Sequence, residues 1–139
     1  MKKIILIVLS VAVIGVVAAL LMYNKPHRDT ASSESDFAVE APALLQEFTE
    51  NEPAANQKYL DKVVAVKGKV KSITTDEEGN INLTLNANND MAGVICTIPK
   101  AEASSAADVK EGDEVTVKGV CTGVLMDVVL IRCVVEKKA

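Results

Sequence analysis

From Lys62 onward, apolar and polar residues alternate along most of the chain, and this alternation constrains the fold more than any other feature. A period of two places successive side chains on opposite faces of a β-strand, so one face can be buried while the other meets water. The pattern therefore predicts five strands in a curved antiparallel sheet or small barrel. The five segments are KVVAVKGKVKSI, INLTLN, GVICTI, DEVTVKGVCTG and DVVLIRCVV, beginning at residues 62, 81, 93, 113 and 127.

The segments between these strands carry turn and helix signals. DEEGN at 76–80 and NANND at 86–90 are rich in residues that favour turns. Between the third and fourth strands, AEASSAAD at 101–108 is expected to form a short helix. Five strands with a helical connection in this place follow the order of an OB-fold, a Greek-key barrel. The predicted class is therefore mainly β, a five-stranded OB-fold barrel.

A helical segment is expected before the barrel, at 42–59. Pro42 suits the first position of a helix, and Leu44, Phe48 and Tyr59 fall near one face at helical spacing. Pro53 interrupts the pattern, which predicts a break or two short helices with Pro53 opening the second. The apolar face is expected to pack on the sheet.

Residues 4–23 form an uncharged, apolar run. At about 1.5 Å per residue, such a helix spans about 30 Å, the thickness of a bilayer core. The run is longer than a signal-peptide core, which favours an uncleaved anchor, although Val17-Ala18-Ala19 resembles a cleavage site. The predicted organisation is a membrane anchor at 1–23, a flexible linker at 24–40 and an OB-fold domain at 41–139.

The charge around the apolar run bears on orientation and on ligands. Lys2 and Lys3 precede the run and Lys25 and Arg28 follow it, so the positive-inside rule is nearly balanced. The short N-terminal tail favours a cytoplasmic N-terminus and an extracytoplasmic (periplasmic) domain. Of the 15 basic residues, 13 follow the run, against all 19 acidic residues. Such an acidic domain is poorly suited to phosphate backbones or anionic lipids.

No motif for catalysis, a cofactor or a metal is present in the sequence. It contains no P-loop, no GxSxG and no dinucleotide-binding glycine pattern. The single histidine, His27, lies in the linker, which excludes a histidine-based triad in a monomer. The acidic turns do not follow EF-hand spacing. We therefore predict no enzyme activity, no cofactor and no metal site.

Several pieces of the chain resemble the tRNA_anti-like family, bacterial OB-fold proteins of lipoprotein type without an assigned function. The matching pieces are NEPAANQKYLDKVVAVKGKV, GVICTIP, VKEGDEVTVKGVCTG and DVVLIRCVV, within residues 42–135. The resemblance implies the OB-fold and says little about activity. This chain differs from the lipoprotein members because its first cysteine, Cys96, lies far from the apolar run.

The family name points to nucleic acid, but the residues argue against it. OB-folds that bind single strands use aromatic stacking, worth about 1–3 kcal/mol per base, and a basic groove. From Asp61 onward the sequence has no Phe, Tyr or Trp, and it carries 10 basic and 12 acidic residues. Lys67, Lys69 and Lys71 form a stripe on one strand face, a candidate weak binding face or simply a solvated surface.

The three cysteines, Cys96, Cys121 and Cys133, all fall on the apolar faces of their strands. They could be buried free thiols that pack as small hydrophobic residues. A Cys121–Cys133 disulfide is the second alternative, and it requires an oxidising compartment. A tight hairpin would place Cys121 opposite Leu130, so this pairing needs a shift of register. A metal site, the third alternative, lacks its usual fourth ligand.

Together these features predict a single-pass, membrane-anchored, extracytoplasmic OB-fold module that binds an unknown protein or small ligand without catalysis. Two alternatives stay open at this stage. The first is a nucleic-acid- or oligosaccharide-binding OB domain, and the second is a purely structural module of the envelope.

Overall fold

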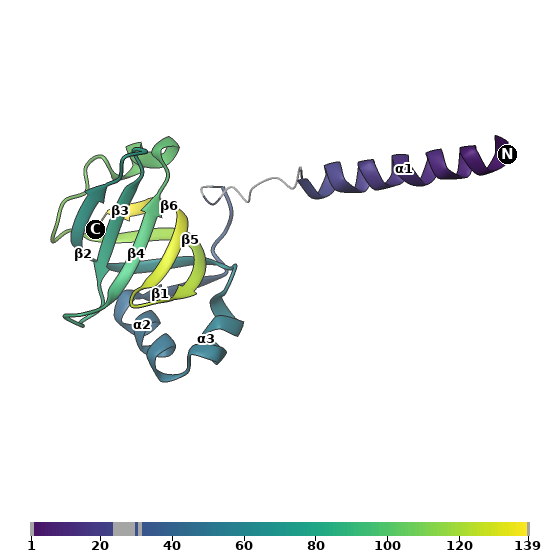
Figure 1. Cartoon of the computed structure of the whole chain (residues 1–139). Helices are drawn as coiled ribbons and strands as arrows, with labels where there is room; N and C mark the ends of the chain where they lie inside the picture. The colour runs from purple at the N-terminus through teal and green to yellow at the C-terminus, as the bar shows by residue number, and fades with distance from the viewer. Residues whose placement is uncertain (1, 24–29, 31, 139) are drawn as a thin grey trace.

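Five strands close into a barrel in the computed structural model, which describes residues 2–23, 30 and 32–138 (Figure 1). The ring order is β2-β3-β4-β6-β5, and β5 pairs back to β2, as the OB-fold prediction requires. Strands β4 and β6 run parallel, and the other neighbours in the ring run antiparallel. The strands are β2 (Val63–Thr75), β3 (Ile81–Asn86), β4 (Gly93–Ile98), β5 (Glu114–Val124) and β6 (Val128–Lys138).

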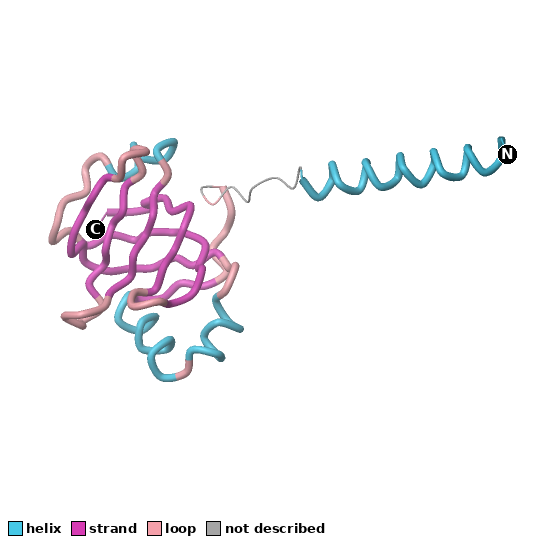
Figure 2. Tube along the Cα trace, in the orientation of Figure 1, coloured by secondary structure: helices cyan, strands magenta, loops and turns pink. Residues whose placement is uncertain are grey.

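Strand β2 closes the ring because it changes partner along its length. Residues Val63 to Lys69 pair with β5, and residues Val70 to Thr75 pair with β3, with a register shift between Val70 and Ser72. Such an irregularity bends a strand and increases its twist, which a small barrel needs. The tube view in Figure 2 shows the resulting crossed layers of strands.

The barrel interior contains the inward-facing residues of all five strands, and aliphatic and cysteine side chains fill it. The alternation predicted from the sequence is confirmed in β3 and β4, where Leu83, Leu85, Val94, Cys96 and Ile98 are buried and the residues between them are half-buried. The fully enclosed residues include Val64, Val66, Leu83, Leu85, Val94, Cys96, Ile98, Val117, Cys121, Leu130 and Cys133.

Two short helices, α2 (Ala41–Glu50) and α3 (Glu52–Tyr59), cover one end of the barrel (Figure 1). The chain breaks between them as Pro53 predicted: the side chain of Asn51 caps α3 by accepting a hydrogen bond from the Ala54 amide (3.2 Å). A 3₁₀ helix, η1 (Lys100–Ala106), forms the connection between β4 and β5 where the sequence predicted a short helix.

The last residues of the linker predicted at 24–40 form a short strand that the sequence did not predict. Residues 24–29 and 31 lie outside the described residues, but Phe37–Glu40 form β1, which pairs in parallel with β2. Asp36 accepts a hydrogen bond from the Val63 amide (3.0 Å), and Ser33 accepts one from Lys118 (2.8 Å). Four residues are too few for a period of two to stand out, and the pairing that stabilises β1 comes from β2.

The first helix, α1 (Lys2–Tyr23), does not pack within the described structure. Its stretch from Lys2 to Leu21 has a mean hydropathy of 3.2 and is 0% buried. It is the one helix in the described part of the chain that is long and apolar enough to cross a membrane. The apolar run thus forms the predicted helix, which suits a membrane anchor or a signal sequence.

Gly119 makes room for Cys133 inside the barrel, so we predict that Gly119→Ala destabilises the fold. A Cβ at this position would overlap the Cys133 sulfur and lie 3.1 Å from the Ile131 carbonyl oxygen. Overpacking of this kind costs about 1–3 kcal/mol in free energy of unfolding. Urea unfolding measures the loss of free energy of unfolding. In a chain that already carries Cys133→Ala, the Gly119→Ala substitution should cost less than it does in the wild type, because the sulfur that it would overlap is gone. An unchanged unfolding midpoint for Gly119→Ala would contradict this packing account.

Candidate functional site

In OB-folds the second and third strands of the barrel, here β3 and β4, present the face that binds ligands, and β6 continues this face beside β4. Here its half-buried side chains are uncharged and most of them lie opposite one another across the strands, while β6 also carries the exposed, charged Arg132. The Thr97 hydroxyl donates a hydrogen bond to the Asn82 side-chain oxygen (2.9 Å). This face therefore offers hydroxyl, amide and aliphatic groups, without the aromatic rings that stack on bases. Its members are Asn82, Thr84, Ile95, Thr97, Val129 and Ile131.

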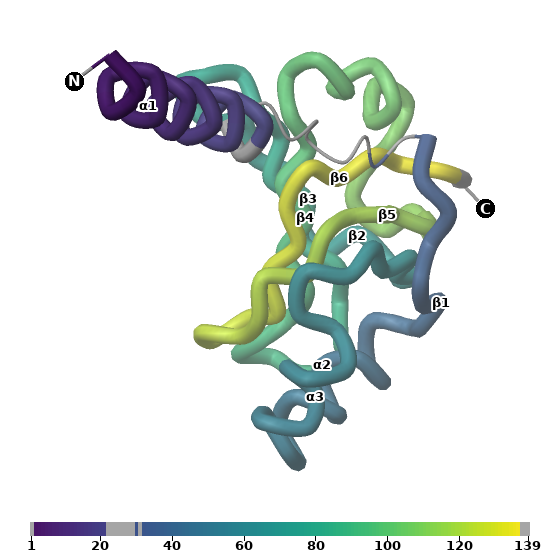
Figure 3. Tube along the Cα trace, turned by 90° about the vertical axis from the view of Figure 1, so that its right-hand side faces the viewer, coloured from purple at the N-terminus to yellow at the C-terminus, as the bar shows by residue number. Residues whose placement is uncertain are grey.

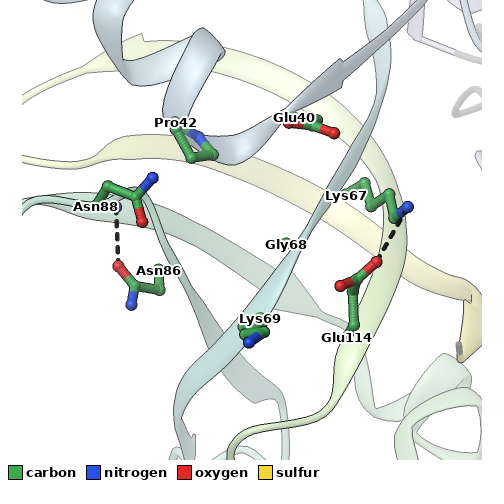
Figure 4. A pocket seen from close by; sticks show the side chains of 8 residues that line it. All are labelled: Glu40, Pro42, Lys67, Gly68, Lys69, Asn86, Asn88 and Glu114. Carbon is green, nitrogen blue, oxygen red and sulfur yellow. Dashed lines mark hydrogen bonds and ion pairs between the residues drawn. The ribbon is translucent and has the colours of Figure 1, made fainter.

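A polar pocket of about 230 Å³ lies beside this face and contains two of the three predicted lysines (Figure 4). Lys67 forms an ion pair with Glu114 (3.0 Å), and this hydrogen bond raises the pKa of Lys67. Lys71 does not join them: its ammonium donates to the main-chain oxygen of Asp90 (3.3 Å), in the turn after β3. The predicted lysine stripe is therefore divided: Lys67 and Lys69 line the pocket, and Lys71 contacts the turn after β3. The pocket is lined by Glu40, Pro42, Lys67, Gly68, Lys69, Asn86, Asn88 and Glu114.

The pocket lies where one edge of β2 changes its hydrogen-bonded partner from β1 to β3. Strand β1 pairs with β2 up to Lys67, and β3 begins its pairing at Val70. Gly68 lies between them, and a Cβ there would lie 3.1 Å from that of Ala41. The small residue keeps this junction open between the asparagines on one side and the Lys67–Glu114 pair on the other (Figure 4).

Chemically, the pocket is suited to holding a polar ligand. It presents two ammonium groups, two carboxylates and two amides. Among the described residues, no group of three or more His, Cys, Asp or Glu could hold a metal ion. The alternation in the sequence indicated Lys67 and Lys69 but not Glu40, Asn86 or Asn88, because these three residues approach the lysines only through the pairing of β1 and β3 with β2.

All three cysteine sulfurs lie inside the barrel, as predicted, and they are free thiols in this structure. Cys121 stands opposite Leu130, so the β5–β6 register does not bring it to Cys133, three residues further along. The predicted Cys121–Cys133 pair is therefore not formed here, and it would need a different register. Instead Cys133 interacts with Cys96, from the neighbouring strand β4, and this interaction contributes to the raised pKa of Cys133.

Burial is the main cause that raises the pKa of Cys133 well above its ordinary value of 9.0, and the interaction with Cys96 adds to it. Burial also raises the pKa of Cys121. A raised pKa means that the folded state disfavours the thiolate. Both groups therefore stay protonated in the folded protein at pH values where the thiols of the unfolded chain ionise.

These shifts predict a loss of stability in alkali. Below about pH 9 the thiols are protonated in both states, so they impose no penalty; above it, ionisation favours the unfolded chain. The free energy of unfolding should therefore fall between about pH 9 and pH 10 more steeply in the wild type than in Cys133→Ala. Urea titrations across this range measure the two slopes. Equal slopes would mean that Cys133 is not the group responsible.

Comparison with known proteins agrees with the barrel. The crystal structure of a "putative nucleic acid-binding lipoprotein" from Klebsiella pneumoniae subsp. pneumoniae MGH 78578 is similar, with 22% identity and a TM-score of 0.61, covering 81% of this chain and 100% of that one. At this identity the similarity shows the fold alone. No curated protein matches the sequence.

Two weaker structural similarities were also found. One is to the OBody AM3L09 bound to hen egg-white lysozyme, with 15% identity and a TM-score of 0.45, covering 59% of this chain and 88% of that one. The other is to a "putative aspartyl-tRNA synthetase" from Leishmania major Friedlin, with 14% identity and a TM-score of 0.49, covering 88% and 26%. The family model named tRNA_anti-like matches residues 1–135, and the chain, an OB-type barrel behind an apolar helix, belongs to this tRNA_anti-like family.

Proposed function

We propose that the protein is a membrane-anchored OB-fold module that binds a partner outside the cytoplasm without catalysing a reaction. The observation that carries the membrane part is α1, whose stretch from Lys2 to Leu21 is 0% buried. Burying apolar surface is worth about 25 cal/mol per Å², and the barrel does not cover this helix. A bilayer supplies that cover, with residues 1–23 as anchor and the barrel domain beyond.

The extracytoplasmic side is supported by the short tail that precedes the apolar run of α1, because so short a tail favours a cytoplasmic N-terminus while the charges at the two ends of the helix nearly balance. Lys2 and Lys3 lie at its start, which favours a cytoplasmic N-terminus under the positive-inside rule. Lys25 and Arg28 follow the helix and oppose this preference.

Binding, in preference to catalysis, is supported by the groups that the described surface offers. The pocket at Lys67 and Lys69 contains ammonium, carboxylate and amide groups. The cysteines are enclosed and their thiols disfavour ionisation at positions 121 and 133. A nucleophile needs access and an activating base, and neither is offered to these thiols. The outer sheet face and the pocket instead resemble recognition surfaces.

Nucleic-acid binding is the second candidate, because the Klebsiella neighbour carries that description. The residues here supply little energy for it. The half-buried outward residues of β3, β4 and β6 include no aromatic ring, and between Val128 and Val135 the one charged residue of β6 is the exposed Arg132. Lys67 is paired with Glu114, so it is not a free cation for a phosphate. We therefore favour a protein or small polar ligand as the partner.

The membrane proposal predicts that the full chain stays with membranes after extraction with alkaline carbonate. Val13→Lys places a charge near the centre of α1, at a cost of about 2.5–3.5 kcal/mol, and should release part of the chain, while Val13→Leu should not.

Protease added to intact spheroplasts should digest the barrel domain. A soluble chain shortened by about twenty residues would show a cleaved signal peptide instead, and a protected domain would place it in the cytoplasm.

The same proposal predicts no measurable binding of single-stranded DNA or RNA at physiological salt. Fluorescence anisotropy with a labelled oligonucleotide and the full chain in nanodiscs tests it. Micromolar affinity that falls steeply with salt would favour the nucleic-acid function, since that dependence reports contacts to phosphates.

A further inference from the structure

Three large apolar side chains project into solvent at one end of the barrel. Leu125 is 93% exposed, Met91 81% and Met126 70%, and outside α1 these are the most exposed large hydrophobic residues of the described chain. Met91 lies in the turn between β3 and β4, and the other two lie in the hairpin between β5 and β6. We call these three residues the apolar tip.

The two loops that carry the apolar tip are held together. The Asp127 carboxylate accepts a hydrogen bond from the Gly93 amide (2.6 Å), which joins the hairpin to the start of β4. Behind it, Val94 of β4 pairs with Val128 of β6. Within the first loop, Asn89 accepts hydrogen bonds from the amides of Met91 (2.8 Å) and Ala92 (3.2 Å). Such ordering before binding lowers the entropy lost on association.

The composition of the hairpin breaks a local rule. Turns favour Gly, Pro, Asn, Asp and Ser, each for a backbone reason, yet this hairpin turns at Leu125-Met126-Asp127. The leucine and methionine add nothing to the turn, and their exposure shows that they add little to the core. Residues that violate local preferences without a benefit to folding are expected at functional sites.

We propose that the apolar tip inserts into an apolar pocket with a basic rim on a partner protein. The tip is convex, so the concave surface must come from the partner. Its two loops, residues 87–92 and 125–127, contain two carboxylates, Asp90 and Asp127, and no basic residue. Lys71 reaches only the main-chain oxygen of Asp90. Methionine is well suited to such a surface because its flexible thioether adapts to an irregular pocket.

A lipid surface fits the apolar tip less well. Loops that enter a bilayer interface commonly carry Trp, Tyr, Lys or Arg, and these two loops have none. The segment that leads from the membrane side also docks elsewhere: Ser33 and Asp36 bond to Lys118 and Val63. In Figure 3 the hairpin projects at the left while this segment descends at the right of the barrel.

This inference rests on the proposed binding function and assigns it a contact surface. The test places the photocrosslinker p-benzoylphenylalanine at Met126 of the full chain in native membranes. A control chain carries it at Glu77, in the β2–β3 turn. We expect a protein adduct of discrete mass from position 126 that is lost when Leu125→Ser is added, and no such adduct from position 77. The adduct is identified by mass spectrometry, and that protein is then purified as the probe.

Binding of the purified probe to the full chain in nanodiscs then gives the decisive measurement. The double variant Leu125→Ser, Met126→Ser should weaken binding at least about tenfold, as expected for anchor residues in a pocket. The matched variant Glu77→Ser, Glu78→Ser should bind like wild type, and both should keep the wild-type melting temperature.

Adducts only to lipid, adducts only to a second copy, no adduct, or unchanged affinity in the double variant would each overturn the inference. These results are distinguishable from failure of the proposed function. If the probe still binds the double variant with wild-type affinity, the module binds a partner through another surface and only the apolar tip is wrong. If the full chain leaves the membrane and binds no protein at any crosslinking position, the proposed function itself fails.

Discussion

The pairing of one strand, β2, with three different neighbours determines most of this structure. Its first half bonds to β5 and to the short β1, and its second half bonds to β3. Because both ends of the sheet order meet on this strand, the sheet closes and leaves no free edge within the ring. The change of partner at Gly68 also opens the polar pocket, so closure and the candidate ligand site have one physical origin.

The two helices compensate for a barrel without aromatic residues. Tyr59 packs edge-on against Phe37 (5.1 Å between ring centres) and lies 6.0 Å from Phe48, which joins β1, α2 and α3. Such aromatic pairs contribute about 0.5–1.5 kcal/mol each beyond buried area. The Glu47 carboxylate accepts hydrogen bonds from Tyr59 (3.0 Å) and Lys58 (3.1 Å), which fixes α2 against α3. The aromatic rings are thus committed to the end of the barrel and are not available on its outer face.

The outer face differs in composition from the stacking surfaces that OB-folds use to bind single strands. Stacking platforms are replaced by threonine, asparagine, isoleucine and valine on β3, β4 and β6. The cations nearby are partly neutralised, as Lys67 is by Glu114. The apolar side chains that do reach solvent lie at the apolar tip, where OB-folds use the loop between their last two strands for recognition. In the function that we propose, the energy for binding comes from insertion of this apolar tip instead of base stacking.

The sequence by itself determined the five barrel strands and most of their faces, but not β1, and not the first half of β6, where Leu130 is buried and Val129 and Ile131 are only half-buried because the strand is irregular at Arg132 (φ 52°). Alternation at Leu83, Leu85, Cys96 and Ile98 predicted which side chains are buried, because the side-chain period of a strand is two regardless of its neighbours. The apolar run predicted α1 and Pro53 predicted the break before α3, because the length of an apolar helix and the missing N–H of proline also act locally. Only the tertiary structure decided which residues meet: Cys133 with Cys96 instead of Cys121, Lys67 with Glu114, and Gly93 with Asp127. These contacts join residues up to 47 positions apart, and strand register, which is set by packing across the closed barrel, brings them together.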